Sequence, residues 1–232
     1  MNSAFNEAIQ LLETLDTDLI SIVFVSLQVS ITALVIGCLI GMPLGALVAI
    51  KKFPGRQGVI VLLNSLMGVP TVIVGVVIYL LLSRTGPLGD LQWLFTAKGM
   101  MLAQTVLTTP LIAALTRQLV EDAWQIHGET MTAIQLPVMA KLKWIVWDCR
   151  FSLSIAVLAG FARAISEVGA VMIVGGNIDQ VTRTMTTAIA LETSKGDLPL
   201  ALALGLVLLG VVLLANLMTS LIKMIAERRY GS

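Results

Sequence analysis

Two opposite charges lie one helical turn apart inside an apolar stretch, and they are the first residues whose types suggest chemistry. Arg163 and Glu167 are the only charges in residues 151–175. A lone ion at the centre of a bilayer costs roughly 3 kcal/mol on insertion scales, whereas opposite charges at i, i+4 can neutralise each other. The spacing therefore predicts an intramembrane ion pair. We interpret it as a structural strut, with a role facing other subunits or a water-filled path as the alternative.

The other reactive side chains do not form a catalytic pattern. No lysine is followed by Ser or Thr, so the phosphate-binding loop of an ATPase is missing. His127 is the single histidine, and Glu167 is the single carboxylate inside a predicted span. Neither a histidine-based triad nor an aspartyl dyad is possible, and Cys38 and Cys149 form no metal-binding cluster with them. We expect no catalytic residue, no metal and no cofactor in this chain.

The composition indicates a chain that lives in a membrane. Of its 232 residues, 57% are hydrophobic and 12% are charged, and the mean hydropathy is +0.93. A soluble globular domain carries about twice that share of charge. The sequence predicts an all-α integral membrane protein with membrane lipid around it and no nucleic-acid partner.

Apolar stretches and polar intervals alternate along the chain. Stretches long enough to cross a bilayer predict five spans, at 19–50, 57–83, 99–116, 151–175 and 198–222. Residues 4–15 read as a surface amphipathic helix within an extracytoplasmic segment 1–18, whose four acidic residues argue against a signal peptide. A polar loop at 117–150, a second interval at 176–197 and a tail at 224–232 complete the prediction, in which 19–223 form one transmembrane domain.

Glycine and proline residues predict where these spans pack closely and where they bend. Gly37, Gly41 and Gly45 recur every four residues and predict a small-residue stripe that packs closely against a neighbouring helix. Pro70 and Pro110 lie inside two other spans. We expect Pro70 to kink its helix.

The distribution of Lys and Arg predicts the orientation. Five spans put the two ends of the chain on opposite sides of the membrane. One side collects ten basic residues, at 51, 52, 56, 117, 141, 143, 150, 223, 228 and 229, and the other side collects four, at 84, 98, 183 and 195. The positive-inside rule then places the N-terminus outside and the C-terminus in the cytoplasm.

The stretch from Gly160 to Ile178, followed by Thr182 to Met185, resembles the permease subunits of oxyanion-importing ABC transporters. It is most similar to the tungstate permeases, with the molybdate and sulfate permeases next. The resemblance implies the type I ABC importer transmembrane fold in a bacterial or archaeal inner membrane. It also implies a homodimer, two cytoplasmic ATPase subunits that carry ATP and Mg, and an extracytoplasmic oxyanion-binding protein.

The same family has a cytoplasmic signature, Glu-Ala-Ala, then Gly, then a later Ile-x-Leu-Pro, that docks into the ATPase. One placement starts at Glu121 and puts His127 at the glycine position. The other starts at Glu129 and is favoured because its distance to the charged span matches the family. The coupling residues that it implies are Glu129, Thr130, Met131, Ile134, Gln135 and Ile145.

The residues themselves predict a partner surface at the same place. A short helix over 129–140 would present Met131, Ile134 and Leu136 as an apolar surface for a groove in another protein. Residues 140–147 could instead rest on the membrane. Gln135 replaces the glycine of the signature, and this puts the expected bend in question.

The outward interval 176–197 predicts the contact with the binding protein. Its polar rim would consist of Asn177, Asp179, Arg183, Glu192 and Lys195. A molybdate or sulfate permease remains the alternative within the family. A stand-alone channel or secondary carrier is the alternative outside it, although the sequence shows no internal repeat of the kind such carriers often have.

Overall fold

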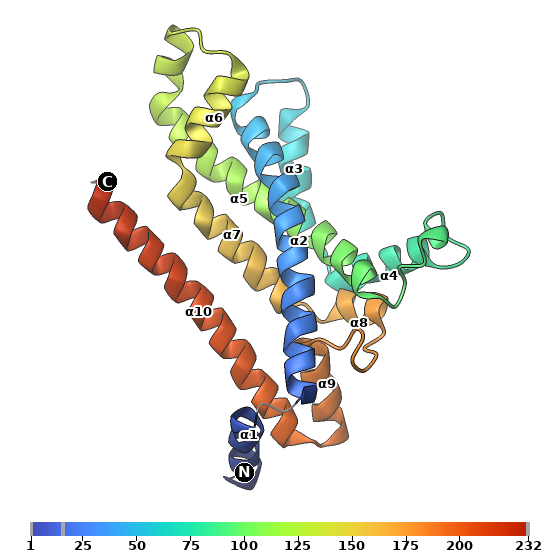
Figure 1. Ribbon diagram of the computed structural model, residues 1–232. Coiled ribbons are helices and arrows are strands. Elements are labelled where there is room, and N and C mark those ends of the chain that lie inside the picture. The colour runs from blue at the N-terminus through green and yellow to red at the C-terminus, as the bar shows by residue number, and fades with distance from the viewer. Residues whose placement is uncertain (1, 15–16, 231–232) are drawn as a thin grey trace. The chain divides into compact units, whose positions relative to one another are not determined.

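The computed structural model describes residues 2–14 and 17–230, and every regular element in this part of the chain is a helix (Figure 1). Parts of the expected N-terminal segment 1–18 and C-terminal tail 224–232 lie outside the described residues, namely residues 1, 15–16 and 231–232. The elements are α1 (Asn2–Glu13), α2 (Thr17–Ile50), α3 (Arg56–Met67), α4 (Thr71–Leu82), the 3-10 turn η1 (Gly89–Leu91), α5 (Ala97–Ala133), α6 (Val138–Asp148), α7 (Arg150–Ile165), α8 (Gly169–Gly175), α9 (Met185–Lys195) and α10 (Leu198–Tyr230).

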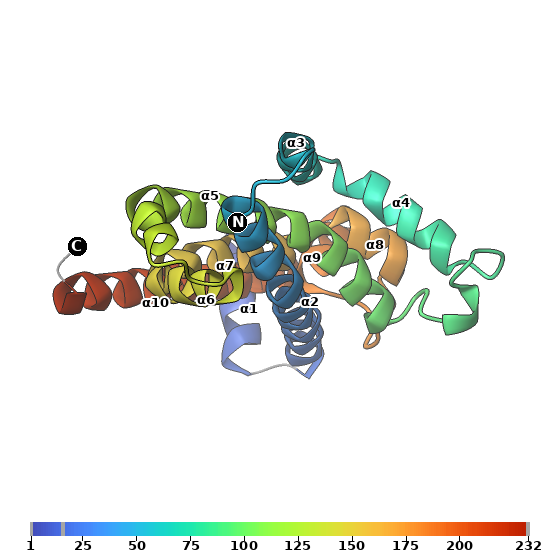
Figure 2. The ribbon, with the colours of Figure 1, turned by 90° about the horizontal axis from the view of Figure 1, so that it is seen from above.

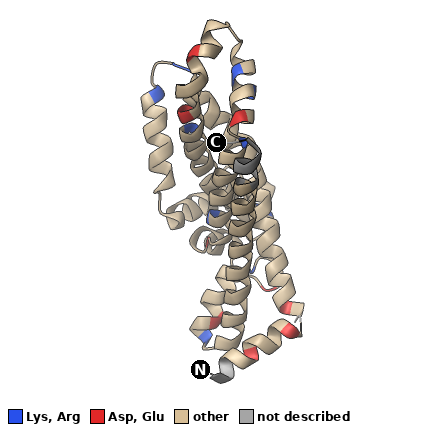
Figure 3. Cartoon of the chain, turned by 90° about the vertical axis from the view of Figure 1, so that its left-hand side faces the viewer, with Lys and Arg blue, Asp and Glu red and all other residues tan. Residues whose placement is uncertain are grey.

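Three described helices are long and apolar enough to cross a membrane by themselves: α2, α5 and α10 over Leu198–Ile222. The bent pairs α3 with α4 and α6 with α7 raise the number of candidate spans to five if each pair counts as one. Long stretches without Lys, Arg, Asp or Glu separate the charged positions (Figure 3). These features define an all-α multi-pass membrane protein, as the composition predicts.

Two expected spans and the expected loop differ from the structure. The span at 57–83 is interrupted between Met67 and Thr71, where Pro70 lacks an N–H and disfavours helix in the residue before it. The span at 151–175 is interrupted between α7 and α8. The polar interval 117–150 is not a loop, because α5 continues to Ala133 and α6 occupies most of the remainder. Pro110 lies inside α5 and does not end it.

The chain forms two compact units, each assembled from three separate stretches. Unit 1 contains residues 1–33, 70–105 and 162–214, and unit 2 contains 34–69, 106–161 and 215–232.

Unit 1 is held together by close helix packing. Val29, Met100 and Val171 form a buried cluster from α2, α5 and α8. Helix α4 lies beside α8 (Figure 2). The two backbones approach so closely that a Cβ built on Gly75 would lie 2.8 Å from the Cα of Ala170.

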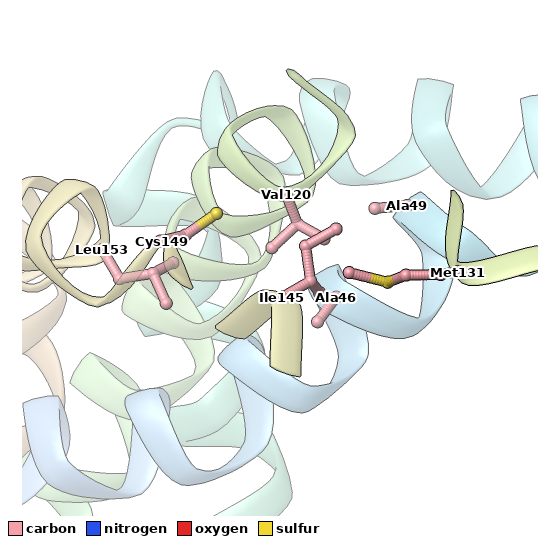
Figure 4. Close-up of a cluster of buried hydrophobic side chains, with 7 residues drawn as sticks. All are labelled: Ala46, Ala49, Val120, Met131, Ile145, Cys149 and Leu153. Carbon is pink, nitrogen blue, oxygen red and sulfur yellow. The ribbon is translucent and has the colours of Figure 1, made fainter. Parts of the chain in front are cut away.

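Unit 2 has a core in which α2, α5, α6 and α7 meet. Its buried members are Ala46, Ala49, Val120, Met131, Ile145, Cys149 and Leu153. In Figure 4 the side chains of Val120, Met131 and Ile145 converge beside Ala46. Burial raises the pKa of the Cys149 thiol to about 11, with Asp148 and Asp122 as further causes. Cys149 is therefore a core residue and not a reactive thiol at neutral pH.

The predicted glycine stripe is confirmed within unit 2. A Cβ on Gly37 would lie 2.8 Å from Oγ1 of Thr108, and one on Gly41 would lie 2.8 Å from the carbonyl oxygen of Thr109. A Cβ on Gly45 would come closer still to the carbonyl oxygen of Ala113. The stripe thus allows α2 to lie directly against the backbone of α5.

We expect Gly45→Ala to destabilise the protein by roughly 1–3 kcal/mol, because the added methyl group meets backbone that a rotamer change cannot move. The matched control is Gly58→Ala in α3, where no atom lies within 4 Å of the added Cβ. The control should be neutral or stabilising by about 0.5–1 kcal/mol. Thermal unfolding of the two variants in detergent measures the difference, and equal melting temperatures would contradict the packing argument.

Candidate functional site

The break between α7 and α8 is built by the polar groups of Ser166 and Glu167. The N–H and the hydroxyl of Ser166 both donate to the carbonyl of Ala162, at 3.2 and 2.6 Å. The N–H of Glu167 donates to Ala164 at 3.3 Å, a tighter spacing than that of an α-helix. These bonds satisfy carbonyls at the end of α7, which would otherwise lack partners in an apolar setting.

Glu167 is a junction residue between the two helices. Its side chain is buried, at 7% exposure, and its Oε1 accepts a hydrogen bond of 3.1 Å from the N–H of Ala170 in α8. Its backbone carbonyl accepts a bond of 2.7 Å from the hydroxyl of Thr186. The carboxylate is therefore used to satisfy an N–H in the first turn of α8.

The predicted ion pair between Arg163 and Glu167 does not form. An i, i+4 pair requires the helix to continue to the second residue, and α7 ends at Ile165. Within the part of the chain that the structure describes, the half-buried Arg163 side chain has neither an ion-pair nor a hydrogen-bond partner. The strut interpretation is thus wrong, and Arg163 is a half-buried cation with no partner in this chain's described residues.

Buried threonines hold the segment after α8, and sequence reasoning missed them. The hydroxyl of Thr182 donates to the carbonyl of Gly175 at 2.6 Å and accepts from the N–H of Ile178 at 2.9 Å. Thr184 and Thr187 form the capping box of α9. The alternation of threonine with other residues from 182 to 187 was the available signal, because such residues recur where backbone groups need side-chain partners.

The interval 176–197, which was predicted to face outward, is only partly the polar rim that was predicted. Asp179 and Lys195 are exposed, but Asn177 and Arg183 are half-buried and Glu192 is buried at 5% exposure. Arg183 pairs with Asp179 at 2.9 Å, and Lys195 pairs with Glu192 at 3.0 Å. Glu192 lies on the buried side of α9 and is therefore not part of an exposed rim.

Unit 2 contains a charged network at the end of α2. The Arg56 guanidinium donates to the carbonyls of Val48 and Ala49, at 2.7 and 3.3 Å, and to Oε1 of Glu121 at 2.7 Å. Arg117 pairs with the other oxygen of Glu121. Both oxygens of Glu121 are thus engaged within the unit, whereas Glu129 on the last turns of α5 is exposed.

The turn between α5 and α6, residues 134–137, has the geometry of a glycine-type helix end. Gln135 has a φ of +53°, in the left-handed region. The N–H of Leu136 donates to Met131 at 3.3 Å, and that of Gln135 donates to Thr132 at 3.0 Å. This is the Schellman pattern, in which glycine normally occupies the position of Gln135. The bend therefore forms with glutamine at the expected glycine position.

The exposed residues of this turn differ from the predicted set. Ile134 is 63% exposed and Met139, next to the start of α6, is 76% exposed. Met131 and Ile145, at 3% and 0%, are buried in the unit 2 core, and Leu136 packs against that core. The separate short helix over 129–140 is likewise absent, since α5 runs to Ala133. The exposed residues at this turn are consequently Glu129, Thr130, Ile134, Val138 and Met139.

The φ of Gln135 makes a sharp prediction for substitutions. Gln135→Gly should be tolerated, because glycine adopts the left-handed conformation at no steric cost. Gln135→Val should lower stability by roughly 1–2 kcal/mol, since a β-branched residue is strained there. The melting temperatures of the two purified variants check this, and the opposite order would show that the turn has another conformation.

No protein-family model matches the chain. Curated relatives do match it. The tungstate uptake system permease protein of Peptoclostridium acidaminophilum is 43% identical over 215 residues, which cover 91% of this chain and 93% of the relative. The probable anion ABC transporter permease protein of Haloferax volcanii is 41% identical, with coverages of 86% and 88%. The tungstate uptake system permease protein of Campylobacter jejuni is 36% identical, with coverages of 94% and 92%.

The fold defines the chain as an all-α, multi-pass membrane protein, and the relatives define its class further as a transport subunit. The chain belongs to the family of ABC transporter permeases for tungstate and other anions. The resemblance carried by the stretch from Gly160 to Met185 is thereby confirmed.

Proposed function

We propose that this chain is the membrane-spanning subunit of an ATP-driven importer of tungstate or a closely related oxyanion. The observation that carries the proposal is the alignment of two tungstate uptake permeases with 91% and 94% of the chain. A sulfate transport permease of Escherichia coli is 30% identical, aligning with 76% of this chain and 63% of the relative. The substrate assigned to the more similar relatives is therefore preferred.

The proposed assembly contains two copies of this chain, two cytoplasmic ATPase subunits and an extracytoplasmic oxyanion-binding protein. The ATPase subunits would supply ATP and Mg, since no lysine of this chain is followed by Ser or Thr as a nucleotide-binding loop requires. The excess of Lys and Arg on one side supports an outward N-terminus and a cytoplasmic C-terminus. In this orientation the exposed turn 134–137 faces the ATPase, and Asp179 and Lys195 face the binding protein.

The exposed turn supports the coupling role because it combines apolar and charged groups on rigid helices. Ile134 and Met139 offer apolar side chains to a groove, and Glu129 offers a charge that has no ion-pair partner among the described residues of unit 2. Glu121 is a poorer candidate, since Arg56 and Arg117 already occupy it. These contacts favour the placement of the family signature that starts at Glu129.

The test is ATP hydrolysis in proteoliposomes that contain the permease, its ATPase and the tungstate-loaded binding protein. We expect Glu129→Ala and Ile134→Asp to abolish the stimulation by the loaded binding protein while leaving the melting temperature unchanged. Glu13→Ala, at an exposed position of α1, is the control and should keep the stimulation. Glu121→Ala should instead lower the melting temperature, because it leaves two arginines without their carboxylate.

Two outcomes would overturn the proposal at different levels. Full stimulation in both the Glu129→Ala and the Ile134→Asp variants would remove the turn from the ATPase interface. Failure of the wild-type chain to purify with any ATPase, or to respond to any oxyanion, would remove the transport function itself.

Arg163 is the side chain that we place on the anion pathway. A cation without a partner in a membrane segment is costly, so such residues normally face a path or a partner. The neighbouring Glu167 is not its ion-pair partner, since that carboxylate accepts from the N–H of Ala170 instead. A half-buried guanidinium attracts a passing oxyanion, and its partial exposure to water weakens the attraction enough for release.

We expect Arg163→Gln to lower tungstate uptake by roughly tenfold or more, the loss of one charge-assisted hydrogen bond. Arg163→Lys should keep a larger share of uptake, since it retains the cation. Arg84→Gln, at an exposed turn position, is the matched control and should transport normally. Uptake of labelled tungstate and melting temperature are measured together. A variant at position 163 that transports at the wild-type rate, or that loses uptake only because it unfolds, contradicts the assignment.

A further inference from the structure

We propose that a groove between α6 and α7 of unit 2 is a binding site for an anionic phospholipid. The groove has a volume of about 790 Å³ and lies where the two helices meet at 77°. Its apolar lining includes Met42, Leu153 and Val157. An acyl chain is the natural occupant of such a lining, because it removes apolar surface from water.

The polar part of the lining has one sign of charge. Lys143 and Arg150 line the groove, and no described lining residue carries a carboxylate. Arg150 is held in place by a 2.7 Å bond from its Nη1 to the carbonyl of Trp147. Its guanidinium also lies 4.7 Å from the centre of the Trp147 ring. Two cations beside an apolar groove, one of them held in place, complement a ligand with a negative head and an apolar tail.

The aromatic residues place the groove at the depth of lipid headgroups. Trp144 and Trp147 also line it and are 47% and 69% exposed. Tryptophan is enriched where a membrane meets water, because its ring is apolar and its N–H is polar. These residues lie in the chain between the exposed turn 134–137 and the apolar length of α7. With the orientation proposed above, the groove opens toward the cytoplasmic leaflet, whose lipids carry negative charge.

The charge pattern favours a lipid over a protein segment as the occupant. A helix from a second copy or a segment of the ATPase would fill the apolar lining equally well. It would also need to bring carboxylates to both Lys143 and Arg150, and bury them at a cost. A phospholipid headgroup supplies its negative charge at the water boundary, where that cost is small.

The test compares two variants that remove the same charge from unit 2. Lys143→Gln with Arg150→Gln changes the groove, and Lys51→Gln with Lys52→Gln changes exposed lysines outside it. Native mass spectrometry of the purified protein measures retained phosphatidylglycerol against phosphatidylcholine. Each cation that contacts the bound headgroup contributes about a fivefold gain, so the groove variant should lose roughly twenty- to thirty-fold in preference for phosphatidylglycerol. The control variant should keep the wild-type preference.

A second variant guards against loss of the fold. Val157→Trp fills the apolar lining without altering charge, and it should release the lipid while the melting temperature in detergent stays within a few degrees of wild type. Equal retention of the two lipids by the wild type, or equal losses in groove and control variants, would overturn the proposal. So would a photocrosslinker at Ser154 that captures a second permease or the ATPase in place of lipid. Lipid retention is measured without transport, so this proposal and the transport function fail separately.

Discussion

Satisfying backbone polar groups away from water is the constraint on which unit 1 depends. In the apolar part of a membrane, every free N–H and C=O costs several kcal/mol, so a helix cannot stop there unless side chains replace its missing bonds. Helix α7 ends at Ile165, and helix α8 begins at Gly169. The hydroxyl of Ser166, the carboxylate of Glu167 and the hydroxyl of Thr186 supply partners for that break. The hydroxyls of the threonines after α8 likewise supply partners for backbone groups at the end of α8 and at the start of α9.

The sequence was sufficient to predict the features that depend on local composition. Hydropathy predicted an all-α membrane protein, and the glycine spacing predicted the face on which α2 meets α5. Pro70 predicted the place at which the chain bends, although the structure has a full break between two helices where a kink was expected. Each of these properties is contained in a few neighbouring residues, so a single sequence reveals it.

The breaks and the burial of single residues depend on distant partners, and there the predictions failed. The sequence near Glu167 does not indicate that the distant Thr186 donates to its backbone carbonyl at a helix break. The ion pair with Arg163 was inferred for a continuous helix and is therefore wrong. Met131 was expected to be an exposed docking residue, but residues from α2 and α6 pack against it and bury it. Glu192 is polar by type and buried by its place in α9. Helix continuity and side-chain orientation are tertiary properties that local patterns do not contain.

Glu121 and Glu167 both use their carboxylates within the chain, and in neither case is the partner Arg163. Glu121 forms ion pairs with Arg56 and Arg117, and Glu167 accepts a hydrogen bond from the N–H of Ala170. Had Glu167 paired with Arg163, the two groups would bind each other, and an oxyanion would have to break that ion pair to reach the guanidinium. Because the carboxylate accepts from the N–H of Ala170 instead, the Arg163 guanidinium has no ion-pair partner among the described residues. The helix break thus separates the two groups, so that the Arg163 guanidinium is available for the anion contact that we propose.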